Sequence, residues 1–384
     1  MVPITSACNL DCPICYTVNR NEGAYRMSAA ELDGILGRLR AQHDDLDIIN
    51  FTGGEPTLHP ELPAFLRQCQ EAGIRRLTVS TNGLRLRDPA YVRELAEVEA
   101  RVVLSLDTFD PAVGRRLLGA ETVRAKLEVL DLLAEHDVTT TLLPAVARGQ
   151  NDHEVGALFD LMLRRPHMVS LEIHPIAFSG QGGSTFDRAA RLGTPDLHAL
   201  LEAHTGGGIT GRDFVPSPLA HPLCYSICYL LVLDDGGYVP FSRLLGRERL
   251  FTLLERSLYL QPNGEVEEAL RWAIDELWAD PDRLPGSEGV LRTLRRLVDA
   301  MFPEGGALPL RERRRIAERA TKAIYIHAHM DAESFDVGRV MRCSVGVPEA
   351  DGSNIPTCSY NVLYRERDGR FVRSAPGRAL PVLR

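Results

Sequence analysis

The chain has 384 residues, of which 44% are hydrophobic and 25% are charged, a composition typical of a folded globular protein rather than a disordered one. Its formal net charge of −8 excludes the broad basic field that general nucleic-acid binding requires. A secretory signal is not evident, and the central apolar run at 229–233 is too short to cross a bilayer. We therefore expect a cytoplasmic protein with no nucleic-acid partner and no transmembrane segment, whose eight cysteines serve metal or redox chemistry.

The first half of the chain alternates strand-like and helix-like patterns. Short β-branched runs predict strands at 2–5, 47–52, 76–81, 101–107, 139–146 and 168–176. Amphipathic stretches predict helices that begin at Ser28, His59, Pro89, Thr122 and Asp152, several of them at a capping residue or a proline. Repeated strand–helix units predict an α/β fold with a parallel sheet, in which binding residues gather at the carboxyl ends of the strands.

The pattern changes near residue 180, where the sequence SGQGGS predicts a flexible break. The basic run at 311–315 lies in a helical stretch and is interpreted as a solvated helix face. Beyond residue 340, an Asp351-Gly352 turn predicts a β-hairpin. The expected regions are an α/β domain at 1–180, a connecting region at 181–244, a helical cap at 245–325 and a C-terminal hairpin domain at 326–384.

Residues suited to chemistry follow the predicted strands. The first strand leads into CNLDCPIC, the second into TGGEP, the third into STNG, the fourth into SLD and the fifth into ARGQND. Two adjacent glycines, Gly53 and Gly54, let a backbone approach a ligand closely, and Glu55 beside them can hold an amine or a hydroxyl. Because the ends of parallel strands meet at one edge of a sheet, we expect a single site there.

Two of these motifs together resemble the radical S-adenosylmethionine (SAM) superfamily. They are the C-x3-C-x2-C of Cys8, Cys12 and Cys15, with Ile14 before the last cysteine, and the run Gly53-Gly54-Glu55-Pro56. The resemblance covers about residues 1–180 and implies a partial (β/α)6 barrel. It implies that three thiolates hold a [4Fe–4S] cluster and leave one iron open to bind SAM. Catalytic zinc sites likewise keep one coordination position open for a ligand. An electron from the cluster would yield a 5′-deoxyadenosyl radical that abstracts hydrogen from the substrate, so an electron donor such as flavodoxin or ferredoxin is expected.

The resemblance also implies contacts with SAM at particular positions. The expected contacts are Gly53, Gly54, Glu55 and Pro56 beside the amino group, Ser105, Asp107, Arg148 and Asn151 near the ribose and carboxylate, Ile14 and the segment 173–176 with His174 beside adenine, and Thr81 and Asn82 in less defined positions. The guanidinium of Arg148 suits a carboxylate. For Asn82 and Asn151, a role in a helix cap or a turn fits about as well as a contact with SAM.

A second set of cysteines lies in the other half of the chain. Cys224 and Cys228 form a C-x3-C pair, and Cys343 and Cys358 flank the predicted hairpin turn. Four thiolates suit a second [4Fe–4S] cluster, a tetrahedral Zn²⁺ or a rubredoxin-like iron, and the remaining alternative is that they share no site. Cys69 falls within a predicted helix and is interpreted as a buried core residue.

Several later segments look like the archaeal tetraether-lipid synthase group and its relatives. They are TTTLLPAVARGQNDHEVG, LEIHPIAFSG and the tail from HMDAESF onward. Members of that group join lipid chains by carbon–carbon bond formation, and some relatives have been considered methylases of pterins. The first hypothesis is therefore C–H activation on a lipid or alkyl chain, and the second is modification of a peptide or a pterin-like molecule. The third, a non-catalytic iron–sulfur redox sensor, is disfavoured by the intact GGEP. No side chain is singled out as catalytic.

Overall fold

One large sheet organises the molecule. The computed structural model describes residues 1–17, 25–43, 46–304, 306–349 and 351–371. Within these ranges an 11-stranded sheet has the order β1-β2-β3-β4-β5-β7-β11-β9-β10, with β6 beside β7 and β8 beside β9. The first six strands along this path are parallel: β1 (Val2–Thr5), β2 (Ile48–Gly53), β3 (Arg76–Thr81), β4 (Arg101–Leu104), β5 (Thr140–Leu142) and β7 (Met168–Pro175). They confirm the expected α/β fold with the parallel sheet of a partial barrel.

Helices alternate with these strands, and local sequence explains where they begin. They are α1 (Ala29–Gln42), α2 (Leu62–Glu71), α3 (Pro89–Glu97), α4 (Pro111–Leu118), α5 (Val123–Glu135) and α6 (Val155–Arg164). Ser28 and Glu31 form a capping box that satisfies two backbone N–H groups at the start of α1. Asp88 and Asp110 cap α3 and α4, each directly before a proline at the first helical position.

The sheet continues beyond the six predicted strands. The added strands are β8 (Val215–Pro216), β9 (Tyr225–Val232), β10 (Tyr238–Pro240) and β11 (Thr321–His327), while the strand predicted at 139–146 is divided into β5 and β6 (Ala145–Val146). Strand β11 is parallel to β7, and β9 is antiparallel to β11. The expected boundary at 325/326 therefore falls inside β11, while the boundary at 180/181 falls inside helix α7 (Gly180–Thr185). The division into four regions stays a prediction, and residues 372–384 of the last region lie outside the described residues.

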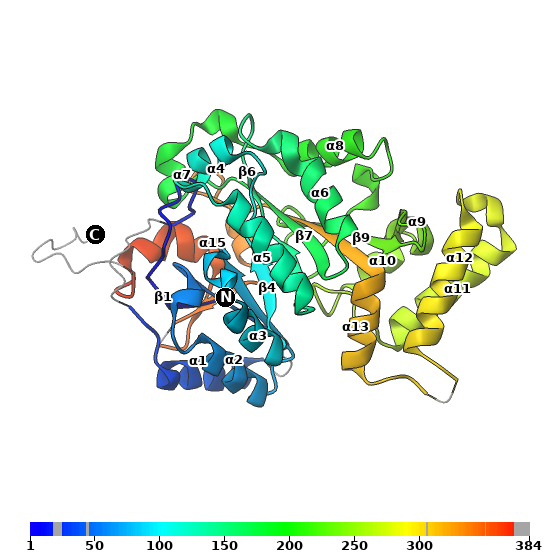
Figure 1. Ribbon diagram of the computed structural model, residues 1–384, viewed down its shortest axis with the longest axis horizontal. Helices are drawn as coiled ribbons and strands as arrows, with labels where there is room; N and C mark the ends of the chain where they lie inside the picture. Colours follow the sequence, from blue (N-terminus) through cyan, green and yellow to red (C-terminus); the bar gives the residue numbers. More distant parts are fainter. Residues whose placement is uncertain (18–24, 44–45, 305, 350, 372–384) are drawn as a thin grey trace, which may run out of the picture.

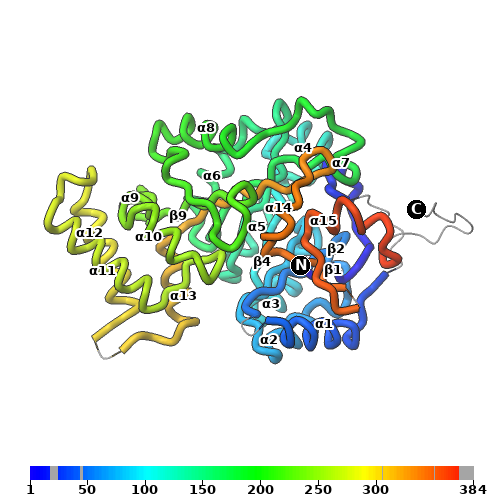
Figure 2. Tube along the Cα trace, turned by 180° about the vertical axis from the view of Figure 1, so that it is seen from behind, coloured from blue at the N-terminus to red at the C-terminus, as the bar shows by residue number. Residues whose placement is uncertain are grey.

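The remaining helices cover the sheet extension and the end of the chain. They are α8 (Thr194–His204), α9 (Phe241–Leu245), α10 (Arg247–Leu253), α11 (Gly264–Ala279), α12 (Ser287–Met301), α13 (Leu310–Ala320), α14 (Val337–Val340) and α15 (Thr357–Ser359). Figure 1 and Figure 2 show α11 and α12 at one end of the molecule, and Figure 2 shows α14 and α15 near β1, away from that end. The described helices include none that is long and apolar enough to cross a membrane.

The predicted hairpin is present near the end of the chain. Strands β12 (Gly346–Pro348) and β13 (Asn354–Pro356) pair antiparallel, and Gly352 between them has a φ of +95°. The N-terminal ammonium of Met1 donates to the carbonyl of Gly346 at 2.6 Å, which joins the two ends of the described chain. The hairpin therefore brings Cys343 and Cys358 to the region of β1.

Helix α13 closes the amino end of the parallel strands through ion pairs. Glu318 accepts from Arg76 of β3 at 3.4 Å and from Arg101 of β4 at 2.9 Å, and the side chains of these three residues are at most 19% exposed. Arg314 lies 3.5 Å from Asp47 and is 11% exposed. The basic run at 311–315 is thus not simply a solvated face, because part of it docks the helix on the sheet.

We predict that Glu318→Gln lowers the free energy of unfolding by about 3 kcal/mol at pH 7, because two buried guanidinium groups lose their carboxylate. Burial opposes ionisation of Glu318, but Arg101 and Arg76 outweigh it and lower its pKa below the ordinary 4.5. Its stabilisation is therefore fully present above that value and is lost as the pH falls through the lowered pKa. Urea denaturation at several pH values checks this. Equal midpoints for Glu318→Gln and the control Glu312→Gln, an exposed position on the same helix, would contradict it.

Candidate functional site

The loop after β1, which carries the first three cysteines, is held against the end of β2. The backbone N–H of Gly54 donates to the carbonyl of Thr5 at 2.8 Å, and that of Glu55 donates to the carbonyl of Ala7 at 2.7 Å. A Cβ on Gly53 would lie 2.3 Å from the Thr5 oxygen, and one on Gly54 would lie 2.3 Å from the Ala7 oxygen. Both positions therefore require glycine, and the pair sets the position of the cysteine loop.

Helix α7 holds the same loop from the other side. The backbone N–H of Gly182 donates to the carbonyl of Cys15 at 2.9 Å, and the side-chain amide of Gln181 donates to the carbonyl of Cys12 at 3.0 Å. Gly180 has a φ of +56°, and a Cβ there would lie 2.4 Å from the backbone of Thr17. The predicted flexible break at SGQGGS is thus wrong, because its glycines allow a close backbone contact.

A cavity of about 1130 Å³ extends below the loop into the space enclosed by the strands. The residues named from the sequence that line it are Cys8, Cys12, Ile14, Cys15, Gly53, Gly54, Glu55, Thr81, Asn82, Ser105, His174 and Cys343. Pro56, Asp107, Arg148 and Asn151 are described but do not line this cavity. The structure therefore brings most of the expected cofactor residues together.

Glu55 links the ends of β2 and β3. One carboxylate oxygen accepts from the hydroxyls of Thr57 and Thr81, each at 2.6 Å, and the other accepts from the backbone N–H of Asn82 at 2.7 Å. The side chain is nearly inaccessible, and burial raises its pKa although these hydrogen bonds oppose the shift. A cationic group bound beside Glu55 would favour its charged form.

Asp107 forms a buried polar cluster with a lysine that sequence reasoning missed. The ammonium of Lys126 lies 3.7 Å from Asp107 Oδ2 and donates to Ser105 Oγ at 3.4 Å, and Lys126 is 1% exposed. The other carboxylate oxygen of Asp107 accepts from the backbone N–H of Ala145 at 2.8 Å. A signal for Lys126 existed in the sequence, since it stands at i+3 from Val123 on the apolar face of α5.

Arg148 and Asn151 take positions that differ from those expected. The Arg148 guanidinium pairs with Asp196 at 2.9 Å and is half-exposed. Asn151 is fully buried and holds a turn, because its side-chain oxygen accepts from Ala147 and its amide donates to the carbonyls of Asp107 and Ala145. Asn151 thus fits the turn alternative that the sequence left open, and the Arg148–carboxylate contact stays a prediction.

Burial keeps several thiols protonated in the absence of metal. Burial, and after it the neighbouring Cys15, raises the pKa of Cys12 far above its usual range. Burial likewise raises the pKa of Cys358 to about 11 and that of Cys69 to about 12. Cys69 lies in the core, as predicted. Metal binding at Cys12 and Cys358 would therefore release protons.

The second set of cysteines does not meet as a group of four. Cys224, Cys343 and Cys358 line one small pocket together with His329 and Arg339. Cys228 lies in the middle of β9 and packs in the core with β7 and β11, so its predicted place in the shared site is wrong. The reason is strand geometry, since four residues along an extended strand span about 13 Å.

Polar groups surround the three remaining thiols. Arg339 Nε donates to Cys224 Sγ at 3.4 Å, and the backbone N–H of Met330 donates to Cys358 Sγ at 3.3 Å. His329 Nδ1 lies 3.6 Å from Cys358 Sγ. These donors would stabilise negative charge on thiolate sulfur.

His174 lies near the end of β7, beside the rings of His327 and His329 rather than alone. All three line the large cavity. Burial lowers the pKa of His327 to about 4, although Glu172 opposes the shift, so this ring is neutral at pH 7. The expected contact of His174 with adenine stays a prediction.

Comparisons with known proteins agree with these motifs. The family model described as "Radical SAM superfamily" matches residues 2–162. The chain is 26% identical to 7,8-dihydro-6-hydroxymethylpterin dimethyltransferase of Methanocaldococcus jannaschii, over 95% of this chain and 76% of that protein. It is 31% identical to GTP 3′,8-cyclase of Chlorobaculum tepidum, over 53% of this chain and 63% of that protein, which is less than two thirds of the cyclase.

Solved structures also show some similarity. Streptococcus suis SuiB bound to S-adenosylmethionine gives a TM-score of 0.46 at 21% identity, over 53% of this chain and 46% of that chain. Native anSMEcpe with bound AdoMet and Kp18Cys peptide gives a TM-score of 0.41 at 15% identity, over 71% of this chain and 82% of that chain.

The family match and the curated relatives support an enzyme rather than a redox sensor. The superfamily uses a [4Fe–4S] cluster and SAM, as the three-cysteine motif and the glycine pair indicated. From its motifs, its sheet and its family match, the chain carries a radical SAM domain over residues 2–162.

Proposed function

We propose that this radical SAM enzyme forms a carbon–carbon bond, as in methylation, on a polar, pterin-like small molecule. Cys8, Cys12 and Cys15 would hold the [4Fe–4S] cluster, and the cavity beside Gly53 and Gly54 would hold SAM. The cluster would supply the low-potential electron for reductive cleavage of SAM. A small electron-transfer protein such as flavodoxin or ferredoxin would deliver that electron.

The observation that carries the choice of substrate is the polar inner wall of the cavity. Side chains from four parallel strands line it with hydroxyl, amide and carboxylate groups: Asn50, Thr78, Ser80, Thr141, Ser170 and Glu172. Asn50 exchanges hydrogen bonds with Ser80, and Thr141 bonds with Ser170 at 2.7 Å. A heteroaromatic ring with amide and amine edges can pair with such groups, whereas an alkyl chain would displace their water without replacing its hydrogen bonds.

The relationship to the pterin dimethyltransferase supports the same substrate class, because that alignment runs through 95% of this chain, including the cysteine hairpin region. A substrate with an alkyl chain is the second candidate. The segment after α10 and helices α11 and α12 add apolar side chains to the lining of the cavity, namely Leu258, Leu260, Val266, Leu270, Leu297 and Met301.

We propose a second iron–sulfur cluster at Cys224, Cys343 and Cys358. Around a single ion with Zn–S bonds of about 2.3 Å, tetrahedral thiolates lie about 3.8 Å apart. Among the described residues, the one group of three or more potential ligand atoms within 4.8 Å of one another is made of histidines. The wider spacing of the cysteines favours a cluster over Zn²⁺ or a rubredoxin-like iron.

The substrate proposal predicts that 6-hydroxymethyl-7,8-dihydropterin increases 5′-deoxyadenosine formation in an anaerobic assay with SAM and dithionite. The variant Asn50→Leu should lose most of this stimulation, because it removes a hydrogen-bonding side chain from the wall, and should retain the unstimulated rate. Chromatography of the nucleoside product checks both, with Cys12→Ala as the blank. Stimulation by a polar lipid extract and none by the pterin would contradict the proposal and favour the alkyl candidate.

The glycine contact predicts the effect of one added methyl group. In Gly54→Ala, the new Cβ would collide with the Ala7 carbonyl and displace the cysteine loop. Iron and sulfide per chain should fall by one cluster, and SAM cleavage should fall at least 100-fold. The matched control is Gly37→Ala, whose Cβ would meet no atom within 4 Å. Full cluster content in Gly54→Ala would show that the contact does not hold the site.

Cys224 and Cys228 lie in different surroundings, so we predict that substituting them has different effects on metal content. Cys224→Ala should lose the iron and sulfide of one cluster. Cys228→Ala should retain the iron and sulfide of both clusters, because Cys228 lies in the sheet core. Metal and acid-labile sulfide analysis of anaerobically prepared protein checks this. Equal losses in the two variants would restore the four-cysteine site predicted from the sequence.

A further inference from the structure

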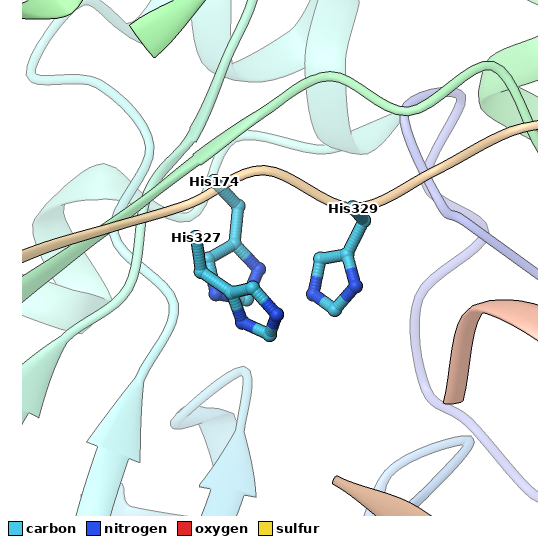
Figure 3. Close-up of side chains that lie close together, drawn as sticks. All are labelled: His174, His327 and His329. Carbon is cyan, nitrogen blue, oxygen red and sulfur yellow. The ribbon is translucent and has the colours of Figure 1, made fainter. Parts of the chain in front are cut away.

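Three histidine side chains meet in the large cavity, apart from the first cysteine set. Strands β7 and β11 are parallel with Ile173 opposite Ile326, so His174 and His327 follow as neighbours across the two strands. His329 stands two residues beyond His327 and projects to the same side. Figure 3 shows the three rings grouped in one space. One ring nitrogen from each lies within 4.8 Å of those of the other two.

The carboxylate of Glu172 lies close to one ring nitrogen of His174 and one of His327. Glu172 Oε1 lies 3.0 Å from His174 Nε2 and 3.5 Å from His327 Nδ1. Tyr225 stacks on the His327 ring with centroids 3.8 Å apart and fixes its plane. With those N–H groups directed at Glu172, Nδ1 of His174 and Nε2 of His327 present lone pairs. Histidines that bind metals commonly pass their other N–H to such a carboxylate.

The third ring is held in a comparable way. His329 Nδ1 lies 3.6 Å from the thiol of Cys358, which leaves Nε2 as its remaining nitrogen. The three side chains all line the cavity, so a group bound between them would face the substrate space. The arrangement combines a close set of nitrogens, an orienting carboxylate and access from one side.

We propose that His174, His327 and His329 bind one divalent first-row transition ion, Zn²⁺ or Fe²⁺. Imidazole suits both ions, and three protein ligands leave at least one position open. Because that position faces the cavity, the ion would bind an oxygen or nitrogen atom of the substrate and orient it. The site uses no cysteine as a ligand, although His329 contacts Cys358 of the second cysteine set, and the proposal does not depend on the identity of the substrate.

The test uses Zn²⁺ as the probe. Anaerobic protein with its clusters is dialysed against Zn²⁺ buffered by a competing chelator, and zinc, iron and sulfide per chain are measured. One zinc per chain is expected, with nitrogen neighbours at about 2.0 Å in zinc K-edge X-ray absorption. His174→Ala and His327→Ala should weaken zinc binding more than 100-fold, and Glu172→Gln should weaken it 10–100-fold while retaining the clusters. The control His204→Ala, on an exposed helix end, should bind zinc normally.

Three results would overturn the proposal. They are zinc binding unchanged by both histidine variants and by Glu172→Gln, sulfur neighbours at about 2.3 Å, or equal loss of zinc in Cys224→Ala. The last two would place the ion at the second cysteine set. Glu172→Gln decides the question if a histidine variant fails to fold, because it removes only the charge of the orienting group. In protein as purified, iron in excess of sulfide that disappears in His327→Ala would identify Fe²⁺ as the resident ion.

Discussion

The backbone contact between the end of β2 and the cysteine loop is the constraint on which the site depends. Gly53 and Gly54 have no side chains, so the carbonyls of Thr5 and Ala7 can approach them closely. Helix α7 presses on the loop from the opposite side with glycines of its own. The GGEP motif therefore fixes the loop that presents three thiols to the cavity.

The rest of the fold gives that loop a suitable space to face. The parallel strands supply a polar wall, and the sheet extension through β11 brings the histidines to the same cavity, which Cys343 also lines. At the opposite end, Glu318 pairs with two buried guanidinium groups and docks α13 beneath the strands. The first cysteine set, the polar wall and the histidines therefore all face one cavity.

Sequence patterns predicted the features that arise from local interactions. The six parallel strands, the cap at Ser28 and the hairpin at Gly352 each depend on neighbours in the chain. Contacts between distant segments were not accessible in this way. The pairing of β7 with β11 joins residues about 150 positions apart, and only that pairing places His174 beside His327. Cys228 was misplaced because a C-x3-C spacing can serve one cluster in a loop but not along a strand.

The central claim is that Cys8, Cys12 and Cys15 hold the cluster whose open iron faces SAM in the cavity. The most direct test is electron paramagnetic resonance of the dithionite-reduced protein with and without SAM. The account predicts that SAM changes the signal of one cluster, that this change persists in Cys224→Ala, and that it is lost in Cys12→Ala. A SAM-dependent change that survives in Cys12→Ala and disappears in Cys224→Ala would contradict the account and place SAM at the second cysteine set.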